Sequence, residues 1–555
     1  MARDTIYCDV LVIGGGAAGL TAAATASSLG LETILAEKEA TVGGTTYISG
    51  GTIWVPDNPI AKECDVPDNK LLAKAYVDYA ANDHRSQDAP DTNARDSYLN
   101  NASAMVTFLR YHGFRWFSRP SRFPDYHPEV PGALPCGGRT LDPAKFDANE
   151  LGGWKRYLEI PTPPLVSKFE ELRYLTQPMA SPFSFMKYCY LALKAWCIGH
   201  RRGSPLAMGC SLVAQLLNMC RRHDNVKVLT STRLTELVTD GDRVIGGVLE
   251  RGNTFLHIRA RRGVLLASGG FAQNQRMRNE HLPSPSAAEW SLSRGDKDSG
   301  DVLAAATCVG AKTTLLHETW GIPTMKDPAT GKLTHAMFEL AKPHSIIVND
   351  RGSRFLNETQ PYGDIVHAMY EARGASIPAW LILDRRYLRR YTLGSLKPWS
   401  NIDKAVQSGY IIRGESISTL SKQLKMPPGE LEGTVRRWNA MCESRVDRDY
   451  DRGGDAYQRF IGDTTIKGNS TMGPLSVGPF FAVRIYPGDA DTKGGLMIDD
   501  RGRVLQRDGR AIDGLYAAGN ITASVFGRAS LGAGVTIGPA MTFAYLAILS
   551  LARSV

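Results

Sequence analysis

The sequence lacks the cysteine patterns of metal clusters and covalent haem. Its nine cysteines include no C-x-x-C and no C-x-x-C-H spacing. Those spacings are typical of zinc and iron–sulfur ligands and of haem attachment. We therefore predict no metal site, and free thiols fit the reducing environment of the cytoplasm.

Long hydrophobic runs are also missing. No run of about 18 or more uncharged apolar residues occurs, so we predict no membrane span. Residues 1–4 lead straight into an apolar strand, which leaves no room for a cleavable signal, and we expect a cytoplasmic protein. The apolar, aromatic segment 183–202 ends in basic residues and has two interpretations. It is either a peripheral membrane contact, or a helix packed on the domain or lining a substrate entrance.

No concentrated basic patch accompanies the positive charge of the chain. The net charge is +9, from 65 Lys and Arg against 56 Asp and Glu. The densest basic clusters, at 201–202, 261–262 and 385–390, lie beside no recognisable nucleic-acid module. We therefore predict a solvated charged surface and no nucleic-acid partner.

What the sequence has is an apolar strand that runs into a glycine turn. Residues 9–13 precede a G-x-G-x-x-G pattern at 14–19, and Glu37 ends a second apolar run 23 positions after Gly14. The glycines of this pattern permit a tight turn, approach to a pyrophosphate at a helix N-terminus, and close packing of helix on strand. Glu37 is placed to bind a ribose diol. The predicted dinucleotide-binding residues are Gly14, Gly16, Ala17, Ala18, Gly19, Glu37 and Lys38.

Two further small-residue segments accompany this cradle. One is the glycine and hydroxyl loop at 43–51, and the other is an apolar strand at 514–518 that ends in a small-residue turn. Together they resemble flavoproteins that bind FAD in an extended pose, so we predict FAD rather than NAD. Gly538-Pro539 is typical of a helix start, whose N-terminus would stabilise negative charge on a reduced flavin. These segments add Gly43, Gly44, Thr45, Ser49, Gly50, Gly51, Gly519, Asn520, Gly534, Thr536 and Ile537 to the predicted FAD site.

Four segments, in order along nearly the whole chain, carry a more specific resemblance. Residues 123–129, 354–362, 487–495 and 532–542 resemble the FAD-dependent 3-ketosteroid dehydrogenases, which lie within the fumarate-reductase-like flavoproteins. To place a double bond next to a ring ketone, such an enzyme removes an α-proton and transfers a β-hydride to flavin N5. It needs a base, donors to the ketone oxygen and a correctly placed flavin.

The resemblance implies specific catalytic residues. Tyr362 matches the tyrosine that takes the α-proton, and Tyr126 matches its hydrogen-bond partner. The backbone N–H of Gly534 matches a donor to the ketone oxygen. The usual pKa of tyrosine, near 10, must fall for this role, and a second phenol donating to it would lower that pKa.

At two positions the chain departs from the family. Ser530 stands where 1,2-dehydrogenating members have a tyrosine, four positions before Gly534. A serine there resembles the branch that desaturates C4–C5, in which it assists proton removal, but that branch has a tyrosine where this chain has Arg528. Ser530 is either catalytic or a turn residue, and Arg528 either donates to the ketone or pairs with a carboxylate. The regiochemistry, C1–C2 or C4–C5, stays open.

The predicted function is therefore FAD-dependent dehydrogenation of an apolar, steroid-like ketone, with an external electron acceptor such as a quinone or a dye. Two alternatives remain. One is a fumarate-reductase-like enzyme acting on another cyclic ketone, a small enoate or a dicarboxylate, and the other is a flavin-binding protein without catalysis. We predict an α/β fold, with a Rossmann-like FAD-binding domain at 1–276 and 466–555. An α+β substrate domain at 277–465 would be inserted into it.

Overall fold

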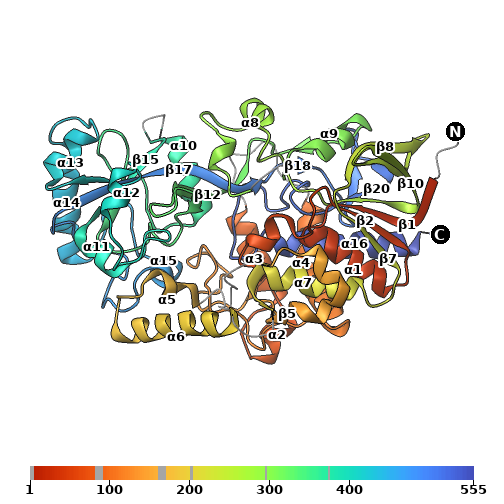
Figure 1. The fold of residues 1–555 in the computed structure, drawn as a ribbon, viewed down its shortest axis with the longest axis horizontal. Helices are drawn as coiled ribbons and strands as arrows, with labels where there is room; N and C mark the ends of the chain where they lie inside the picture. The colour runs from red at the N-terminus through yellow and green to blue at the C-terminus, as the bar shows by residue number, and fades with distance from the viewer. Residues whose placement is uncertain are drawn as a thin grey trace.

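The structure is a computed structural model and describes residues 5–81, 92–160, 171–199, 204–293, 297–372 and 376–554. These residues form two large β-sheets side by side, each covered by helices (Figure 1). Three further sheets within these residues have two strands each. The start of β1 and the end of α16 lie at the same end of the molecule. The predicted α/β class is confirmed.

The first sheet contains the predicted cradle. Strand β1 is buried along most of its length, as expected for a strand covered on both faces. It pairs in parallel with β2 on one side and β10 on the other, so that Val10 lies opposite Thr33 and Gly263. Within the described residues the sheet has eight strands. They are β1 (Thr5–Ile13), β2 (Thr33–Ala36), β7 (Val226–Leu229), β8 (Arg233–Asp240), β9 (Arg243–Arg251), β10 (Thr254–Leu266), β19 (Arg503–Leu505) and β20 (Ala511–Ala517).

A layer of helices covers one face of this sheet. Helix α1 (Ala17–Ser28) is made of small residues and packs against α7 (Met208–Cys220) and α16 (Ile537–Arg553). The first turn of α1 also lies close to the glycine turn that follows β1. This approach requires glycine, because a Cβ at Gly19 would lie 1.8 Å from the Gly14 carbonyl oxygen. Helix α4 (Thr92–Tyr111) packs in turn against α16. The predicted strand, turn and helix at 9–28 are thus confirmed.

The second sheet lies between β10 and β19 in the sequence. Within the described residues it has six strands, and β17 lies near its centre, paired with β12, β15 and β16. The strands are β12 (Thr319–Lys326), β13 (Leu333–His335), β14 (Ser345–Val348), β15 (Ala379–Asp384), β16 (Ile412–Gly414) and β17 (Phe480–Thr492). The predicted boundaries at 277 and 466 stay predictions. β17 follows the second of these and belongs to the second sheet.

Successive side chains along these strands point to opposite faces of the sheet, and each face has its own hydrophobic core. Ile347 and Leu381 point into a core with helices α10 (Tyr362–Glu371), α11 (Arg385–Arg390) and α12 (Asp403–Gln407). Ile346 and Ile382 point to the opposite face, which α13 (Ile417–Gln423) and α14 (Glu430–Ser444) cover. This two-residue period is the one that a pleated strand requires.

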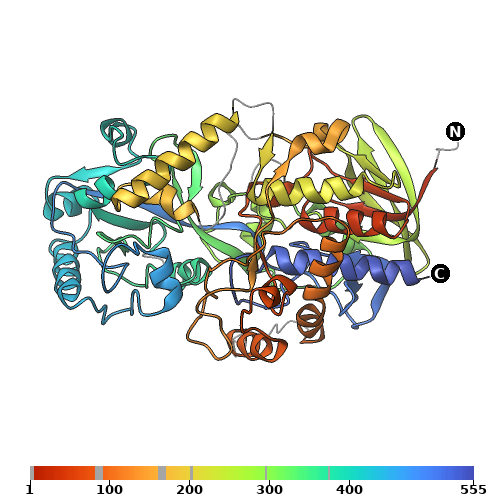
Figure 2. The same cartoon turned by 90° about the horizontal axis from the view of Figure 1, so that it is seen from below.

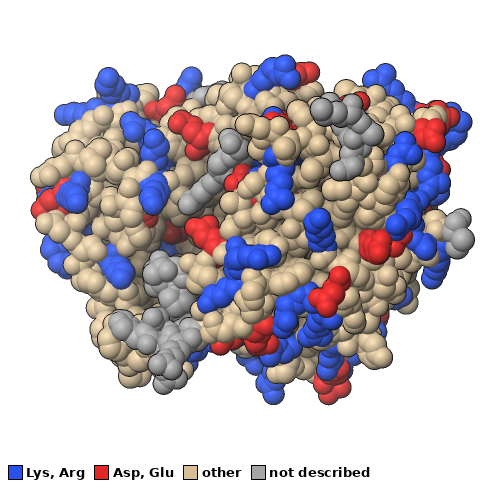
Figure 3. Space-filling view, turned by 45° about the vertical axis from the view of Figure 1, so that its right-hand side comes forward, with Lys and Arg blue, Asp and Glu red and all other residues tan. Residues whose placement is uncertain are grey.

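Further helices and short strands lie outside these two sheets. They are α2 (Pro59–Glu63), α3 (Lys70–Ala80), α5 (Leu172–Thr176), α6 (Pro182–Gly199), α8 (Gln275–His281), α9 (Asp301–Cys308), α15 (Ala456–Ile461), β3 (Ile53–Trp54), β4 (Thr140–Leu141), β5 (Phe146–Asp147), β6 (Pro205–Leu206), β11 (Thr313–Thr314) and β18 (Gly495–Leu496). On the face seen in Figure 3, Lys and Arg are interspersed with Asp and Glu.

Strand β17 joins the two halves. It runs from the second sheet toward the first, as Figures 1 and 2 show. At its end, Thr492 Oγ1 accepts a hydrogen bond of 3.1 Å from the backbone N–H of Phe271, just beyond β10. The residues directly after Thr492 therefore lie where the two halves meet.

Candidate active site

The glycine cradle leaves open space at the start of α1. A Cβ at Gly14 would lie 2.3 Å from the Ala267 carbonyl oxygen, and its φ of +104° requires glycine. A Cβ at Gly16 would instead meet only Thr46 Oγ1, at 3.9 Å. Gly16 caps α1 without a side-chain hydrogen bond. The Ala17 N–H donates to Thr46 Oγ1 at 3.2 Å. The other N–H groups of the first turn and the open space at this helix N-terminus suit a pyrophosphate.

Glu37 lies at the end of β2, beside the cradle. Its carboxylate accepts a hydrogen bond of 2.6 Å from Gly15 N and one of 2.9 Å from Glu39 N. Burial raises the pKa of Glu37, and the two backbone hydrogen bonds act in the opposite direction. The carboxylate is thus fixed at the edge of the cradle where a ribose diol is predicted.

A pocket joins the cradle to the C-terminal segment. Residues from the start of α1 and from the start of α16 line it together. Of the residues predicted for the cofactor, those lining it are Gly14, Gly16, Ala17, Ala18, Glu37, Lys38, Gly44, Thr45, Gly519, Asn520, Thr536 and Ile537. Two helix N-termini and a glycine-lined cradle in one pocket fit an extended dinucleotide such as FAD.

The other predicted cofactor residues lie outside this lining. They are Gly19, Gly43, Ser49, Gly50, Gly51 and Gly534. Gly43 N donates a hydrogen bond to the Gly15 carbonyl oxygen at 2.8 Å and so holds the glycine turn of the cradle in place. A Cβ at Gly51 would lie 2.4 Å from Gly209 N, because this loop packs on the start of α7.

Two buried carboxyl groups line the same pocket. Asp298 Oδ2 accepts a hydrogen bond from Thr45 Oγ1 at 3.0 Å, and Asp491 Oδ2 accepts from Gly270 N at 3.0 Å and from Asn520 Nδ2 at 2.9 Å. Burial raises the pKa of both groups, and the charge of Asp298 raises that of Asp491 further. The sequence does not predict either aspartate as a site residue, because an isolated acid between glycine motifs has no characteristic spacing.

The structure brings the two predicted tyrosines together. Tyr126 Oη donates a hydrogen bond to Tyr362 Oη at 2.9 Å, and the ring centroids lie 5.4 Å apart. Burial raises the pKa of Tyr362 above its usual value, and the hydrogen bond from Tyr126 reduces this rise only in part, so the expected fall of this pKa is not found in the protein alone. The surrounding cluster is largely apolar and aromatic. It contains Phe123, Tyr126, Met337, Phe338, Ala341, Tyr362, Tyr457, Phe460, Ile461 and Ala533.

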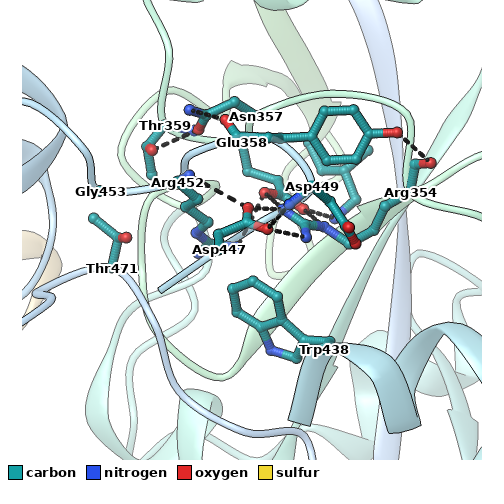
Figure 4. Close-up of polar contacts among 12 residues, drawn as sticks. Arg354, Asn357, Glu358, Thr359, Trp438, Asp447, Asp449, Arg452, Gly453 and Thr471 are labelled. Atoms are coloured by element: carbon teal, nitrogen blue, oxygen red, sulfur yellow. Dashed lines mark hydrogen bonds and ion pairs between the residues drawn. The ribbon is translucent and has the colours of Figure 1, made fainter. Parts of the chain in front are cut away.

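A buried ionic network holds the segment that leads to Tyr362. Arg354 contacts Glu358 and Asp447, each at 2.8 Å (Figure 4). Arg452 Nη1 lies 3.3 Å from Glu358 Oε2. Burial alone would raise the pKa of Glu358, but Arg354 and Arg452 outweigh it and hold that pKa below its usual range. The network fixes the backbone just before α10, which begins at Tyr362.

Hydrogen bonds from neighbouring residues to its carbonyl oxygens hold the segment 528–534 in place. Tyr76 Oη and Tyr126 N donate to the Leu531 carbonyl oxygen at 2.6 and 3.0 Å. Thr140 Oγ1 donates to that of Ala533 at 3.0 Å, and Trp54 N to that of Gly534 at 3.1 Å. The hydrogen bonds between described residues include none from the Gly534 N–H. This N–H is therefore available to a ligand.

Arg528 adopts one of its two predicted roles. Its Nη2 lies 2.5 Å from Glu371 Oε1, and its Nε lies 3.8 Å from Glu318 Oε1. Its Nε also donates to His367 Nδ1 at 3.3 Å. The guanidinium thus pairs with carboxylates, as the second alternative had it.

Ser530 lies close to the tyrosine pair and to an unpredicted lysine. A Cβ at Gly363, the residue after Tyr362, would be 3.2 Å from Ser530 Oγ. The buried Lys493 Nζ lies 3.5 Å from the same oxygen. Lys493 lies in the segment 487–495 that resembles the family, but the sequence alone assigns it no role.

Comparisons with known proteins place the chain among FAD-dependent flavoproteins. The FAD binding domain family matches residues 9–537. The chain is 38% identical to a 3-oxosteroid 1-dehydrogenase of Mycolicibacterium smegmatis, over 98% of this chain and 97% of that protein. It is 36% identical to one of Mycobacterium tuberculosis, over 98% of each chain.

A solved structure extends the similarity to three dimensions. The 3-ketosteroid delta1-dehydrogenase of Sterolibacterium denitrificans, in complex with 1,4-androstadiene-3,17-dione, superposes with a TM-score of 0.90. The two chains are 33% identical, and the match covers 99% of this chain and 100% of the other. The similarity therefore includes both sheets and the segments that carry the tyrosine pair.

Proposed function

We propose that this chain, which belongs to the FAD binding domain family of flavoproteins, is a dehydrogenase that introduces a double bond between C1 and C2 of a 3-ketosteroid. The observation that carries the proposal is the Tyr126–Tyr362 hydrogen bond within an apolar cluster. Full-length similarity to 3-oxosteroid 1-dehydrogenases supports the C1–C2 position.

The surroundings of the tyrosine pair suit an apolar ring system. Phe123, Phe338 and Ala533 lie in its cluster and offer carbon surface. A dicarboxylate would instead need several cationic side chains converging on two carboxylates. Arg528 is paired with Glu371 and Glu318, so its charge is partly neutralised. These contacts favour a ketosteroid over a fumarate-like substrate.

Tyr362 acts as the base in this proposal. As a phenolate it takes the α-proton at its Oη, and Tyr126 stabilises the phenolate through the hydrogen bond that it donates. The arginine network before α10 holds Tyr362 in position. Positioning of this kind contributes to rate because the base need not be ordered during the reaction.

The Gly534 N–H and the Ser530 hydroxyl hold the ketone oxygen. Negative charge develops on this oxygen as the α-proton leaves, and fixed donors stabilise that charge. Position 534 requires glycine, because its φ is +94° and because a Cβ there would lie 2.6 Å from Ile53 Cα. The position of the N–H is therefore fixed by packing against β3.

The cradle, the pocket between α1 and α16, and Asn520 would hold FAD. When bound, FAD accepts the hydride removed from the β-carbon. We further propose that an external acceptor, a quinone or in the assay a dye, reoxidises the enzyme.

We also propose that α6 touches a membrane surface. No helix of the described residues is long and apolar enough to cross a membrane. One face of α6 nevertheless exposes large apolar and aromatic side chains, beside Lys187 and Lys194. Apolar side chains with lysines between them suit an interface of anionic lipid. The exposed residues are Phe183, Phe185, Met186, Tyr190, Leu193 and Trp196.

The test of the proposed function is anaerobic reduction of the yellow holoenzyme. We expect a saturated or 4-ene 3-ketosteroid to bleach the flavin, and succinate to leave it oxidised. With a dye as acceptor, NMR of the product should place the new double bond at C1–C2. A C4–C5 product from a 5α-reduced substrate would overturn the position, bleaching by succinate alone would overturn the substrate class, and no bleaching by any ketone would favour a non-catalytic flavoprotein.

A further inference from the structure

We propose that Lys493 is a positioning residue of this reaction, which holds the 528–530 turn and keeps the Ser530 hydroxyl as a donor to the ketone oxygen. The inference rests on the proposed function and deepens it. It identifies the group that supports Ser530, which stands where a tyrosine of the resembled family would reach the ketone directly.

Lys493 directly follows β17 and is almost completely buried, with 1% of its surface exposed. Its Nζ donates to the Arg528 carbonyl oxygen at 2.7 Å and to the Ala529 carbonyl oxygen at 3.3 Å. The ammonium also lies 4.3 Å from the ring centroid of Trp320. A buried ammonium needs such partners, so its position and that of the turn are fixed together.

The same ammonium determines how Ser530 can bond. Lys493 Nζ lies 3.5 Å from Ser530 Oγ, and an ammonium can only donate. The Ser530 oxygen is therefore the acceptor in this contact, which leaves its own hydrogen for another acceptor. A hydroxyl that accepts from a charged donor is itself a stronger donor. This compensates in part for the shorter reach of serine.

Lys493 extends a pattern that the rest of the segment shows. Tyr76 and Thr140 hold the carbonyl oxygens of Leu531 and Ala533. Lys493 holds the two carbonyl oxygens before Ser530 in the same way. These carbonyl oxygens accept hydrogen bonds from neighbouring side chains of the protein. Two donors of the segment are left for the substrate, the Ser530 O–H and the Gly534 N–H.

The charges around Lys493 give the inference a pH signature. Glu318 and Asp364 favour its charged form, whereas burial, the largest effect, and Arg528 disfavour it. Together they lower the pKa of Lys493 to about 8. Glu318 itself accepts a hydrogen bond of 2.8 Å from His367 Nε2. The support given to Ser530 should therefore weaken as the pH rises through about 8.

Lys342 provides a matched control. It is also buried with 1% of its surface exposed, and its Nζ donates to the carbonyl oxygens of Ile461 and Gly462 at 2.8 and 3.1 Å. Burial lowers its pKa to about 8 as well. Lys342 lies outside the 528–534 segment, so Lys342→Met reproduces the loss of a buried ammonium without touching Ser530.

The experiment measures flavin reduction by a 3-ketosteroid from about pH 6 to about pH 10 in the holoenzyme. Phenolate formation at Tyr362 raises the rate with pH in the wild type and in the variants of this experiment alike. On this rise we expect the wild type to lose rate as the pH passes about 8, a loss that we call the alkaline fall. Lys493→Met and Ser530→Ala should each lower the rate at pH 7 about tenfold or more and abolish the alkaline fall, since removal of an oxyanion donor costs at least that much. The double variant should be no slower than the slower single variant. Ser530→Thr, which keeps the hydroxyl, and Lys342→Met should both retain the alkaline fall.

Two kinds of failure are distinguishable. If the wild type is not reduced by any 3-ketosteroid, the proposed function fails and this inference fails with it. If the wild type is reduced but Lys493→Met keeps its rate and pH profile, or if the two single effects multiply, only the inference fails. Should Lys493→Met not bind FAD, Ser530→Ala decides: an unchanged alkaline fall in that variant overturns the inference.

Discussion

Tyr126 donates its phenol hydrogen to Tyr362 Oη across 2.9 Å, although 236 positions separate the two residues in the sequence. Tyr362 begins α10, which packs on the second sheet. Tyr126 is held from the other side, because its backbone N–H donates to the Leu531 carbonyl oxygen at 3.0 Å. The pair therefore forms only when both halves of the molecule are folded and in contact.

Loss of the proposed base should stop the reaction before any hydride is transferred. We expect Tyr362→Phe to lower the rate of flavin reduction by about a hundredfold or more, as loss of a general base does. Stopped-flow absorbance of the flavin measures this rate. The control is Tyr370→Phe on the same helix, whose hydroxyl donates to the Pro285 carbonyl oxygen at the surface. Equal rates in the two variants would remove Tyr362 from its role.

The partner phenol should set the pH range of activity. The hydrogen bond from Tyr126 lowers the pKa of Tyr362 against the larger effect of burial. Without that bond the pKa of Tyr362 rises, so fewer molecules carry the phenolate at a given pH. We expect Tyr126→Phe to shift the ascending limb of the pH–rate profile to higher pH. An unshifted limb with a uniformly lower rate would mean that Tyr126 acts by packing alone.

The fold was predictable where the pattern was local. The sequence at 9–28 predicts one structure, a strand, a glycine turn and a helix. Each glycine of the pattern meets a backbone requirement, which is a tight turn, the approach of a ligand or the close packing of helix on strand. Tyr126 and Tyr362 were predictable only through resemblance, because a single tyrosine has no period or spacing. Lys493 and the pair Asp298 and Asp491 were missed for a related reason. Their importance depends on burial and on partners distant in the sequence.

The open space at Gly16 should belong to the cofactor. A Cβ there meets nothing in the protein closer than 3.9 Å, and the φ of −78° suits any residue. We expect Gly16→Ala to fold normally as apoprotein but to bind FAD at least about tenfold more weakly, because a methyl group would occupy the place of the pyrophosphate. Flavin fluorescence titration of the apoprotein measures this affinity.

A second glycine supplies the control for that variant. Gly433 lies inside α14, and a Cβ there also meets nothing within 4 Å. Gly433→Ala should leave FAD affinity unchanged and raise stability by about 0.5–1 kcal/mol through helix propensity. If Gly16→Ala bound FAD as tightly as Gly433→Ala, the pyrophosphate would have to lie elsewhere.

The buried network of Figure 4 should make stability sensitive to acid. Arg354 and Arg452 hold the pKa of Glu358 below its usual range, so the stabilisation is complete at neutral pH and is lost as the pH falls through that lowered pKa. We expect Glu358→Gln to lower the free energy of unfolding by about 3 kcal/mol at pH 7 and to flatten its acid dependence. Thermal unfolding followed by circular dichroism measures both effects.

An exposed pair tests whether burial is the cause. Arg437 contacts Asp449 at the surface of α14, and 68% of its side chain is exposed. Arg437→Met should cost less than about 1 kcal/mol. A cost equal to that of Glu358→Gln would mean that the Figure 4 network owes nothing special to its burial.

The exposed face of α6 should direct the protein to lipid. We expect the wild type to float with vesicles that contain phosphatidylserine and to be released by high salt, because lysines contribute to the attraction. Exchange of Leu193 and Trp196 for Glu should abolish flotation. The same exchange at Leu71 of α3, which is 81% exposed, should have no effect. Binding that survives the α6 exchange would place the contact elsewhere.

The central strand of the second sheet imposes a constraint on length. Along β17, residues pair with β12 and β15, and its last residue bonds to the chain just beyond β10. One inserted residue would advance everything beyond it by about 3.4 Å and turn each side chain to the opposite face. Thr492 would then leave its partner, and Lys493 would leave the turn before Ser530. The number of residues in β17 is therefore fixed by contacts with both sheets. Insertions during evolution are expected in the surface loops of this protein and not in β17.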